Sequence, residues 1–198
     1  MLMIVDFTNS DLLVGIIVLA MVLIIFWKKN KSFSYLFFFS VFWIYIMGVV
    51  SVVVFPFVIG ISNPNFKASV NLIPLNFGYC HPAMLSLCIS NLYENVLLTI
   101  PFGFGISFIV RIKSKNIFWL AIAVGFALEL TQLIMSFATR NSFRVVDIND
   151  VILNAIGVLL GYGIFRIFGW LYLYVINKFK IQRRQIFIYI DDVVRQTN

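Results

Sequence analysis

The sequence predicts an all-α integral membrane protein of about five transmembrane helices, with its N-terminus outside and its C-terminus in the cytoplasm. Three observations lead to this fold class. Of the 198 residues, 62% are hydrophobic and 12% are charged, whereas soluble domains carry roughly 25% charged residues. The hydrophobic residues gather in five runs that can cross a hydrocarbon core about 30 Å thick. Basic residues gather in alternate connections between these runs, which indicates the orientation.

The five hydrophobic runs fall at residues 12–27, 34–61, 95–110, 116–137 and 149–169. The first run follows Asp6 and Asp11 instead of positive charges, so we expect a retained span and not a cleaved signal peptide. In the second run, Pro56 is expected to kink the helix near one end. The stretch 62–90 is too rich in proline, asparagine and glycine for a span. We treat residues 1–198 as a single membrane domain.

The basic residues orient these spans. Of the 15 lysines and arginines, the connections 28–31 and 111–115 carry three each, and the C-terminal segment 178–198 carries five. The positive-inside rule places all three segments in the cytoplasm. The segment 178–198 is then a basic cytoplasmic tail, either solvated or folded as a short amphipathic helix on the inner membrane surface.

The net charge of +7 does not indicate a nucleic-acid partner. The basic residues lie between hydrophobic runs and are not interleaved with aromatic residues, so membrane lipids with anionic headgroups are the expected partners. Cys80 and Cys88 lie in one connection, where they could form a disulfide on an oxidising side or remain free thiols. His81 lacks further ligands at a metal-binding spacing, so we expect no metal site there.

Polar residues gather at the outer ends of the last three spans. Glu129 lies about 12 Å below the outer end of its span, at 1.5 Å per residue. This depth is too great for the side chain to reach water, so it needs a proton, a cation or an arginine as partner. The residues that share this outer location, our candidates for a polar cleft, are Glu94, Asn95, Glu129, Gln132, Arg140, Arg144, Asp147, Asp150 and Asn154.

One face of the last span combines carboxylates with glycines. At 100° per residue, an arc of about 80° holds Asp147, Asp150, Asn154, Gly157 and Gly161. The two glycines are expected to let a neighbouring helix pack closely, as small residues do in membranes. The polar end of the same face is expected to open on the outer surface.

Two interpretations of these polar residues stay open. In a structural interpretation, Asp147 and Asp150 cap the last helix, and Arg140 or Arg144 neutralises Glu129. In a functional interpretation, the convergence of four acids on one side exceeds what a cap requires, and ionisable groups within a membrane mark a functional site. The sequence identifies no catalytic residue and no cofactor, although carboxylate oxygens could bind a divalent cation.

Four stretches of this sequence resemble the VanZ-like family of bacterial membrane proteins. They are NLIP from Asn71, ENVLLTIPFGF from Glu94, ELTQ from Glu129 and RVVDINDVILNAIGVLLGY from Arg144. The last stretch fits the family pattern R-x-x-D-x-x-D-x-x-x-N-x-x-G. Together the four stretches extend over roughly residues 71–163, and the first two spans match in hydropathy alone.

The resemblance implies a multi-pass protein of the bacterial cell membrane that lowers susceptibility to teicoplanin-type glycopeptide antibiotics. It implies no particular reaction. The interpretation that needs the fewest further assumptions is a non-catalytic protein that acts at lipid-linked cell-wall precursors or on the antibiotic itself. In this interpretation, Arg140 and Arg144 would engage a phosphate or a carboxylate. The alternatives are a membrane-embedded hydrolase or transferase acting on a lipid phosphate or wall-precursor lipid, and a proton-coupled transporter or flippase in which Glu129 carries the proton.

Overall fold

The computed structural model describes residues 3–60, 66–76, 85–141, 145–182 and 184–196, and of residues 85–88 it describes the backbone. The helices in this part of the chain are α1 (Asn9–Lys28), α2 (Phe33–Val53), α3 (Leu85–Gly105), α4 (Ile117–Thr139), α5 (Ile148–Phe179) and α6 (Gln185–Gln196). Strand β1 (Met3–Val5) pairs antiparallel with β2 (Phe57–Ile59), and β3 (Val70–Asn71) pairs parallel with β4 (Val146–Asp147).

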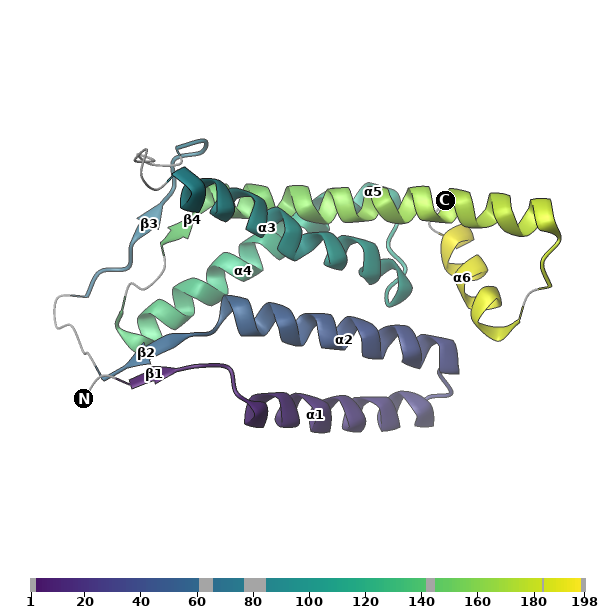
Figure 1. The fold of residues 1–198 in the computed structure, drawn as a ribbon, viewed down its shortest axis with the longest axis horizontal. Coiled ribbons are helices and arrows are strands. Elements are labelled where there is room, and N and C mark those ends of the chain that lie inside the picture. Colours follow the sequence, from purple (N-terminus) through teal and green to yellow (C-terminus); the bar gives the residue numbers. More distant parts are fainter. Residues whose placement is uncertain (1–2, 61–65, 77–84, 142–144, 183, 197–198) are drawn as a thin grey trace.

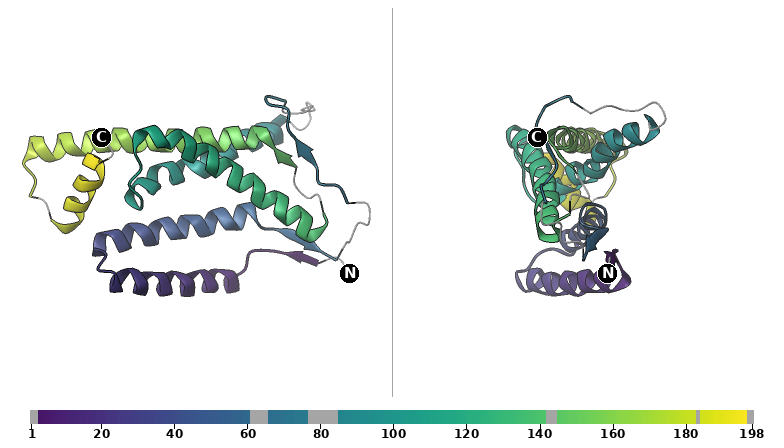
Figure 2. Two further views of the ribbon diagram at one scale, coloured as in Figure 1. Left: turned by 180° about the vertical axis from the view of Figure 1, so that it is seen from behind. Right: turned by 90° about the vertical axis from the view of Figure 1, so that its left-hand side faces the viewer.

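The helices form two neighbouring groups, α1 with α2 and α3 with α4 and α5 (Figures 1 and 2). Helices α3, α4 and α5 pack together, α2 lies beside them, and α1 lies on the far side of α2. All four strands and the N-terminal segment lie at one end of the bundle, which we call the strand end. The α1–α2 connection, the α3–α4 connection and α6 lie at the opposite end. We call it the basic end because the basic segments 28–31, 111–115 and 178–180 fall there.

Within the described part of the chain, four helices are long and apolar enough to cross a membrane: α1, α2, α4 and α5. The prediction of a helical fold with several helices of membrane-spanning length and composition is therefore confirmed. Helix α3, which corresponds to the third predicted span, is not among the four, and Asn91, Glu94 and Asn95 make its first half polar. The fifth crossing and the orientation of the termini therefore stay predictions.

The predicted second span, 34–61, is too long. Helix α2 ends at Val53, and residues Phe57–Ile59 form β2 instead of continuing as a helix kinked at Pro56. Pro56 has no backbone N–H with which to continue the helical hydrogen bonding. Hydropathy missed this boundary because a short apolar strand and an apolar helix segment have the same pattern.

The ends of two further predicted spans are also wrong. Helix α3 begins at Leu85, ten residues before the predicted run 95–110, so the last part of the stretch considered too broken for a span is helical. Helix α5 continues to Phe179, beyond the predicted end at residue 169. Its 32 residues correspond to about 48 Å at 1.5 Å per residue, which exceeds the hydrocarbon thickness of about 30 Å. The predicted runs 12–27 and 116–137 lie within α1 and near the bounds of α4.

Helices α3 and α5 run parallel and in close contact through glycines. Gly157 faces Thr99 and Gly161 faces Ile100, so the contacts advance in the same direction along both helices. A Cβ added to Gly161 would lie 2.0 Å from the carbonyl oxygen of Ile100. The hydroxyl of Thr99 donates a hydrogen bond to the Asn154 carbonyl oxygen, at 2.8 Å. The two backbones can approach this closely because the contact residues on α5 are glycines.

Helix α4 covers the other side of α5. A Cβ added to Gly125 would lie 2.5 Å from the carbonyl oxygen of Val151, near the start of α5. Ala121, one turn earlier on α4, is completely buried. Small residues on α4 therefore bring this helix against α5, so α5 is the central helix of the three.

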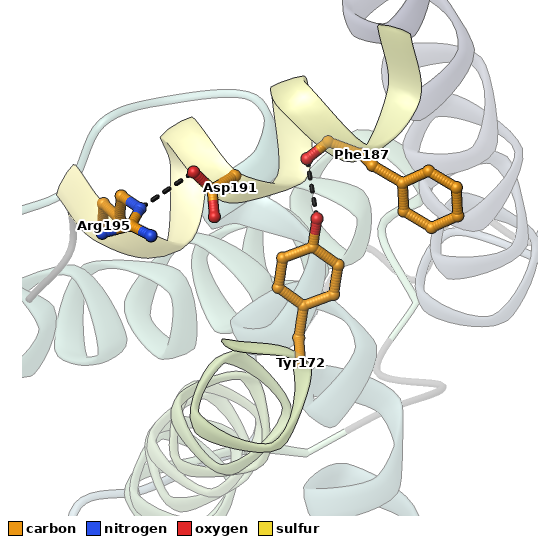
Figure 3. A network of polar contacts seen from close by, with 4 residues as sticks. All are labelled: Tyr172, Phe187, Asp191 and Arg195. Atoms are coloured by element: carbon orange, nitrogen blue, oxygen red, sulfur yellow. Dashed lines mark hydrogen bonds and ion pairs between the residues drawn. The ribbon is translucent and has the colours of Figure 1, made fainter. Parts of the chain in front are cut away.

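The C-terminal segment folds back on the bundle as α6 (Figure 3). The hydroxyl of Tyr172, on α5, donates to the Phe187 carbonyl oxygen at 2.7 Å, and Arg195 pairs with Asp191 within α6 at 2.8 Å. Val194 is 3% exposed and packs against Gly169. The sequence left open a solvated tail or an amphipathic helix, and the structure shows an amphipathic helix that packs on the protein.

Tyr189 also fixes α6. Burial raises the pKa of its hydroxyl to about 12, so the group keeps its proton at neutral pH. The hydroxyl donates to the carbonyl oxygen of Phe108, at the end of the turn η2 (Ile106–Phe108) that follows α3. This bond connects the C-terminal helix to the basic end of α3.

The membrane topology can be tested with alkaline phosphatase fusions, which become active only in an oxidising compartment where their disulfides form. We expect a fusion after Lys115 to be inactive and a fusion after Asn141 to be active in a bacterial host, because the sequence predicts that α3 crosses the membrane as well as α4. A fusion after Lys29 is the inactive control. Activity after Lys115 would show that α3 does not cross.

The close approach of α3 and α5 makes Gly161→Ala destabilising. The new methyl group would overlap the Ile100 carbonyl, and overpacking of this kind costs about 1–3 kcal/mol of unfolding free energy. Gly163→Ala is the matched control, because a Cβ at Gly163 meets no atom within 4 Å. The measurement is thermal unfolding of both variants in detergent micelles, and equal stabilities would contradict this account of the helix contact.

Candidate functional site

Asp147 joins three segments at the strand end. Its backbone N–H donates to the Glu129 carboxylate at 3.0 Å, which attaches β4 to α4. Its own carboxylate accepts the backbone N–H and the side-chain amide of Asn149, both at 2.8 Å, and thereby caps α5. The same carboxylate accepts the side-chain amide of Asn71 at 2.9 Å, which attaches β3.

Asn149 fixes the turn that follows β3. Its side chain is 2% exposed. Its Oδ1 accepts the Leu75 N–H at 2.6 Å, and its Nδ2 donates to the Asn76 carbonyl oxygen at 3.0 Å. The sequence analysis missed this role, because Asn149 stands between polar neighbours and nothing in the sequence separates a buried amide from an exposed one.

Glu129 is only 3% exposed. It lies on α4, and its carboxylate accepts the Asp147 backbone N–H described above. The sequence analysis expected Glu129 to need a partner because of its depth in the membrane. In the structure, Glu129 holds the start of α5 against α4 through this hydrogen bond. Arg144, one of its expected partners, lies outside the described residues.

Three of the other predicted site residues lie apart from this group. Arg140 is exposed and adopts a left-handed backbone conformation, φ 49°, that ends α4. Gln132 lines a small open hollow together with Val53 and Ser136. Glu94 is exposed on α3. Cys80 also lies outside the described residues, so both alternatives for Cys80 and Cys88, a disulfide or two free thiols, stay open.

A second polar group lies between α3 and α5. We call it the polar seam and define it as Asn95, Thr99, Asp150 and Asn154. Asp150 is half-buried, lies close to Asp147 and faces the side-chain amide of Asn95. That amide also donates to a carbonyl oxygen one turn earlier on α3, at 3.2 Å.

Asn154 is the deepest member of the polar seam. Its side chain is 1% exposed, and its Oδ1 has no hydrogen-bond partner among the residues that the structure describes. It lies one turn after Asp150 and 40° around α5 from it, at 100° per residue. Both side chains therefore belong to the face of α5 that Gly157 and Gly161 turn toward α3.

The two polar groups differ in what their acids can do. Glu129 and Asp147 accept backbone and amide hydrogen bonds that hold the fold together. Asp150 faces the seam and remains accessible in part. No cluster of three or more acidic, histidine or cysteine side chains suited to a metal is found in the described part of the chain. A divalent cation therefore stays a prediction from sequence.

The geometry defines a class: a helical membrane protein with a polar site at one end of its bundle. The family model for VanZ/LLP1 matches residues 42–169, which extend from within α2 to within α5 and include both polar groups. The chain therefore belongs to the VanZ/LLP1 family, as the sequence motifs suggested. No curated protein and no solved structure matches it significantly.

Asn149→Ala tests the structural group around Asp147. The change removes three hydrogen bonds of a buried amide, and unsatisfied buried partners cost about 1–3 kcal/mol each. We expect a lower unfolding free energy and faster hydrogen exchange at the Leu75 amide, measured by mass spectrometry in micelles. Asn91→Ala, an exposed asparagine at the same end, should leave both unchanged. Unaltered exchange in Asn149→Ala would show that this amide does not hold the turn.

Proposed function

We propose that this VanZ/LLP1-family protein lowers the susceptibility of a bacterium to teicoplanin-type glycopeptide antibiotics from the outer face of the cell membrane. It acts there on access to lipid-linked cell-wall precursors or on the antibiotic itself. The observation that carries the proposal is the half-buried carboxylate of Asp150 in the polar seam, which faces the side-chain amide of Asn95 and, unlike the Asp147 carboxylate, does not cap α5.

The location of the seam supports an outward-facing site. The seam lies toward the strand end, opposite the basic segments that the positive-inside rule assigns to the cytoplasm. Lipid-linked wall precursors and glycopeptides meet at the outer leaflet, so a polar site that opens there is placed to act on either. The exposed Arg140 lies at the same end, where a guanidinium can engage a phosphate or a carboxylate.

The chemistry of the seam supports binding over catalysis. Its hydroxyl, on Thr99, donates to backbone carbonyl oxygens, including that of Asn154, and not to a carboxylate. The buried Glu129 and its neighbour Asp147 accept hydrogen bonds from the backbone. A nucleophile needs an adjacent base within hydrogen-bond reach, and this arrangement does not provide one. A non-catalytic role is therefore the function that the geometry supports best.

Asp150→Asn tests this function. We expect expression of the wild-type chain in a sensitive Gram-positive host to raise the inhibitory concentration of teicoplanin, and the variant to lose that protection. The exchange keeps the shape of the side chain and removes its charge. Both proteins must be present at equal membrane levels, checked by immunoblot.

Asp192→Asn is the matched control for this experiment, because Asp192 is an exposed acid on α6 at the basic end. It should protect as well as the wild type. Equal protection by Asp150→Asn would show that the carboxylate has no part in the function, and absence of protection by the wild type would refute the antibiotic role itself.

A further inference from the structure

We propose that the polar seam binds a primary ammonium group, with the Asp150 carboxylate and the Oδ1 atom of Asn154 accepting its N–H groups. This inference rests on the proposed function and specifies the chemistry of its ligand. The ammonium can belong to a lipid headgroup or to an amine on a soluble peptide or antibiotic, and the two sources are separated by the experiment below.

The buried amide of Asn154 is the first argument. Its Oδ1 is enclosed by protein and has no hydrogen-bond partner among the described residues. A buried acceptor without a donor costs about 1–3 kcal/mol, so a sequence does not retain one at a helix contact without compensation. A ligand that brings an N–H group into the seam supplies the missing donor.

The charge of the seam is the second argument. Asp150 and Asp147 are neighbouring carboxylates, and their mutual repulsion falls when a positive charge binds between or beside them. Asp147 uses its carboxylate for three hydrogen bonds of the fold. Asp150 is therefore the group that can form a charge-assisted bond to a ligand, and such bonds are the stronger ones.

The number of acceptors favours an ammonium group over a divalent cation. Calcium takes six to eight oxygen ligands, and magnesium takes six in a strict octahedron. The seam offers one carboxylate and the oxygens of two amides. A primary ammonium has three N–H donors, which the oxygens of Asp150 and Asn154 can satisfy together with one water molecule.

The exposed start of α3 carries a further acid beside the seam. Asn91 lies one turn before Asn95 and Glu94 directly before it, and both are exposed. An exposed carboxylate there raises the local concentration of cations, which favours the approach of an ammonium group to the partly exposed Asp150.

The test uses two probes on the purified full-length chain in phosphatidylcholine nanodiscs. Butylammonium carries three N–H donors, whereas butyltrimethylammonium has the same charge and chain but no N–H. We expect butylammonium to shift the side-chain amide resonances of Asn95 and Asn154 saturably, and the quaternary probe to leave them unchanged. Equal responses to both probes, or no response to either, would overturn the proposal without affecting the test of antibiotic susceptibility.

Two variants locate the site. Asp150→Asn and Asn154→Leu should each weaken butylammonium binding at least about tenfold, as expected when one charge-assisted or buried hydrogen bond is removed. Asp192→Asn should bind as the wild type does. Thermal unfolding shows whether each variant is folded, and the comparison of the two probes on the wild type decides the matter if a variant is not. Undiminished binding in both folded variants would contradict the assignment.

A second set of nanodiscs identifies the source of the amine. Replacing part of the phosphatidylcholine with phosphatidylethanolamine should weaken butylammonium binding by competition if the natural ligand is a lipid headgroup. Unchanged binding would assign the site to the amine of a non-lipid ligand.

Discussion

The junction of α4, α5 and β3 at the strand end depends on one hydrogen bond, from the backbone N–H of Asp147 to the buried carboxylate of Glu129. Through it, α4 holds the residue that caps α5 and pairs with β3. A carboxylate enclosed in this way is costly to bury unless it accepts strong hydrogen bonds. The bond thus accounts for an acid deep in an apolar helix, and it fixes where α5 begins relative to α3.

The position of α5 in turn determines which acid is available for a ligand. Because Asp147 is used as a cap and Glu129 as its support, Asp150 is the carboxylate that is left on the face turned to α3. The structural interpretation of the sequence therefore holds for Asp147, which caps α5. The functional interpretation stays a proposal, and it concerns Asp150, three residues further along the same motif.

Hydropathy predicted the bounds of the apolar helices α1 and α4. It did not predict helix ends that depend on contacts between segments of the protein. The bounds of α1 and α4 were predicted closely, because their composition alone distinguishes them. The end of α2 and the start of α3 were not predicted, since these depend on strand pairing by Phe57–Ile59 and on packing of a polar helix against α5. In the site, helical periodicity grouped Asp150 with Asn154 correctly, but it could not show that Asn149 bonds to a turn more than 70 residues earlier.

The polar first half of α3 has a consequence for how the protein is made. A helix with Asn91, Glu94 and Asn95 in one stretch is a poor substrate for lateral release into lipid during synthesis. Its partner α5, whose glycines and Asn154 carbonyl accommodate it, is translated some 50 residues later. If α3 crosses the membrane, as the sequence predicts, we expect its insertion to be completed only after α5 emerges, whereas the apolar helices α1 and α2 can insert early.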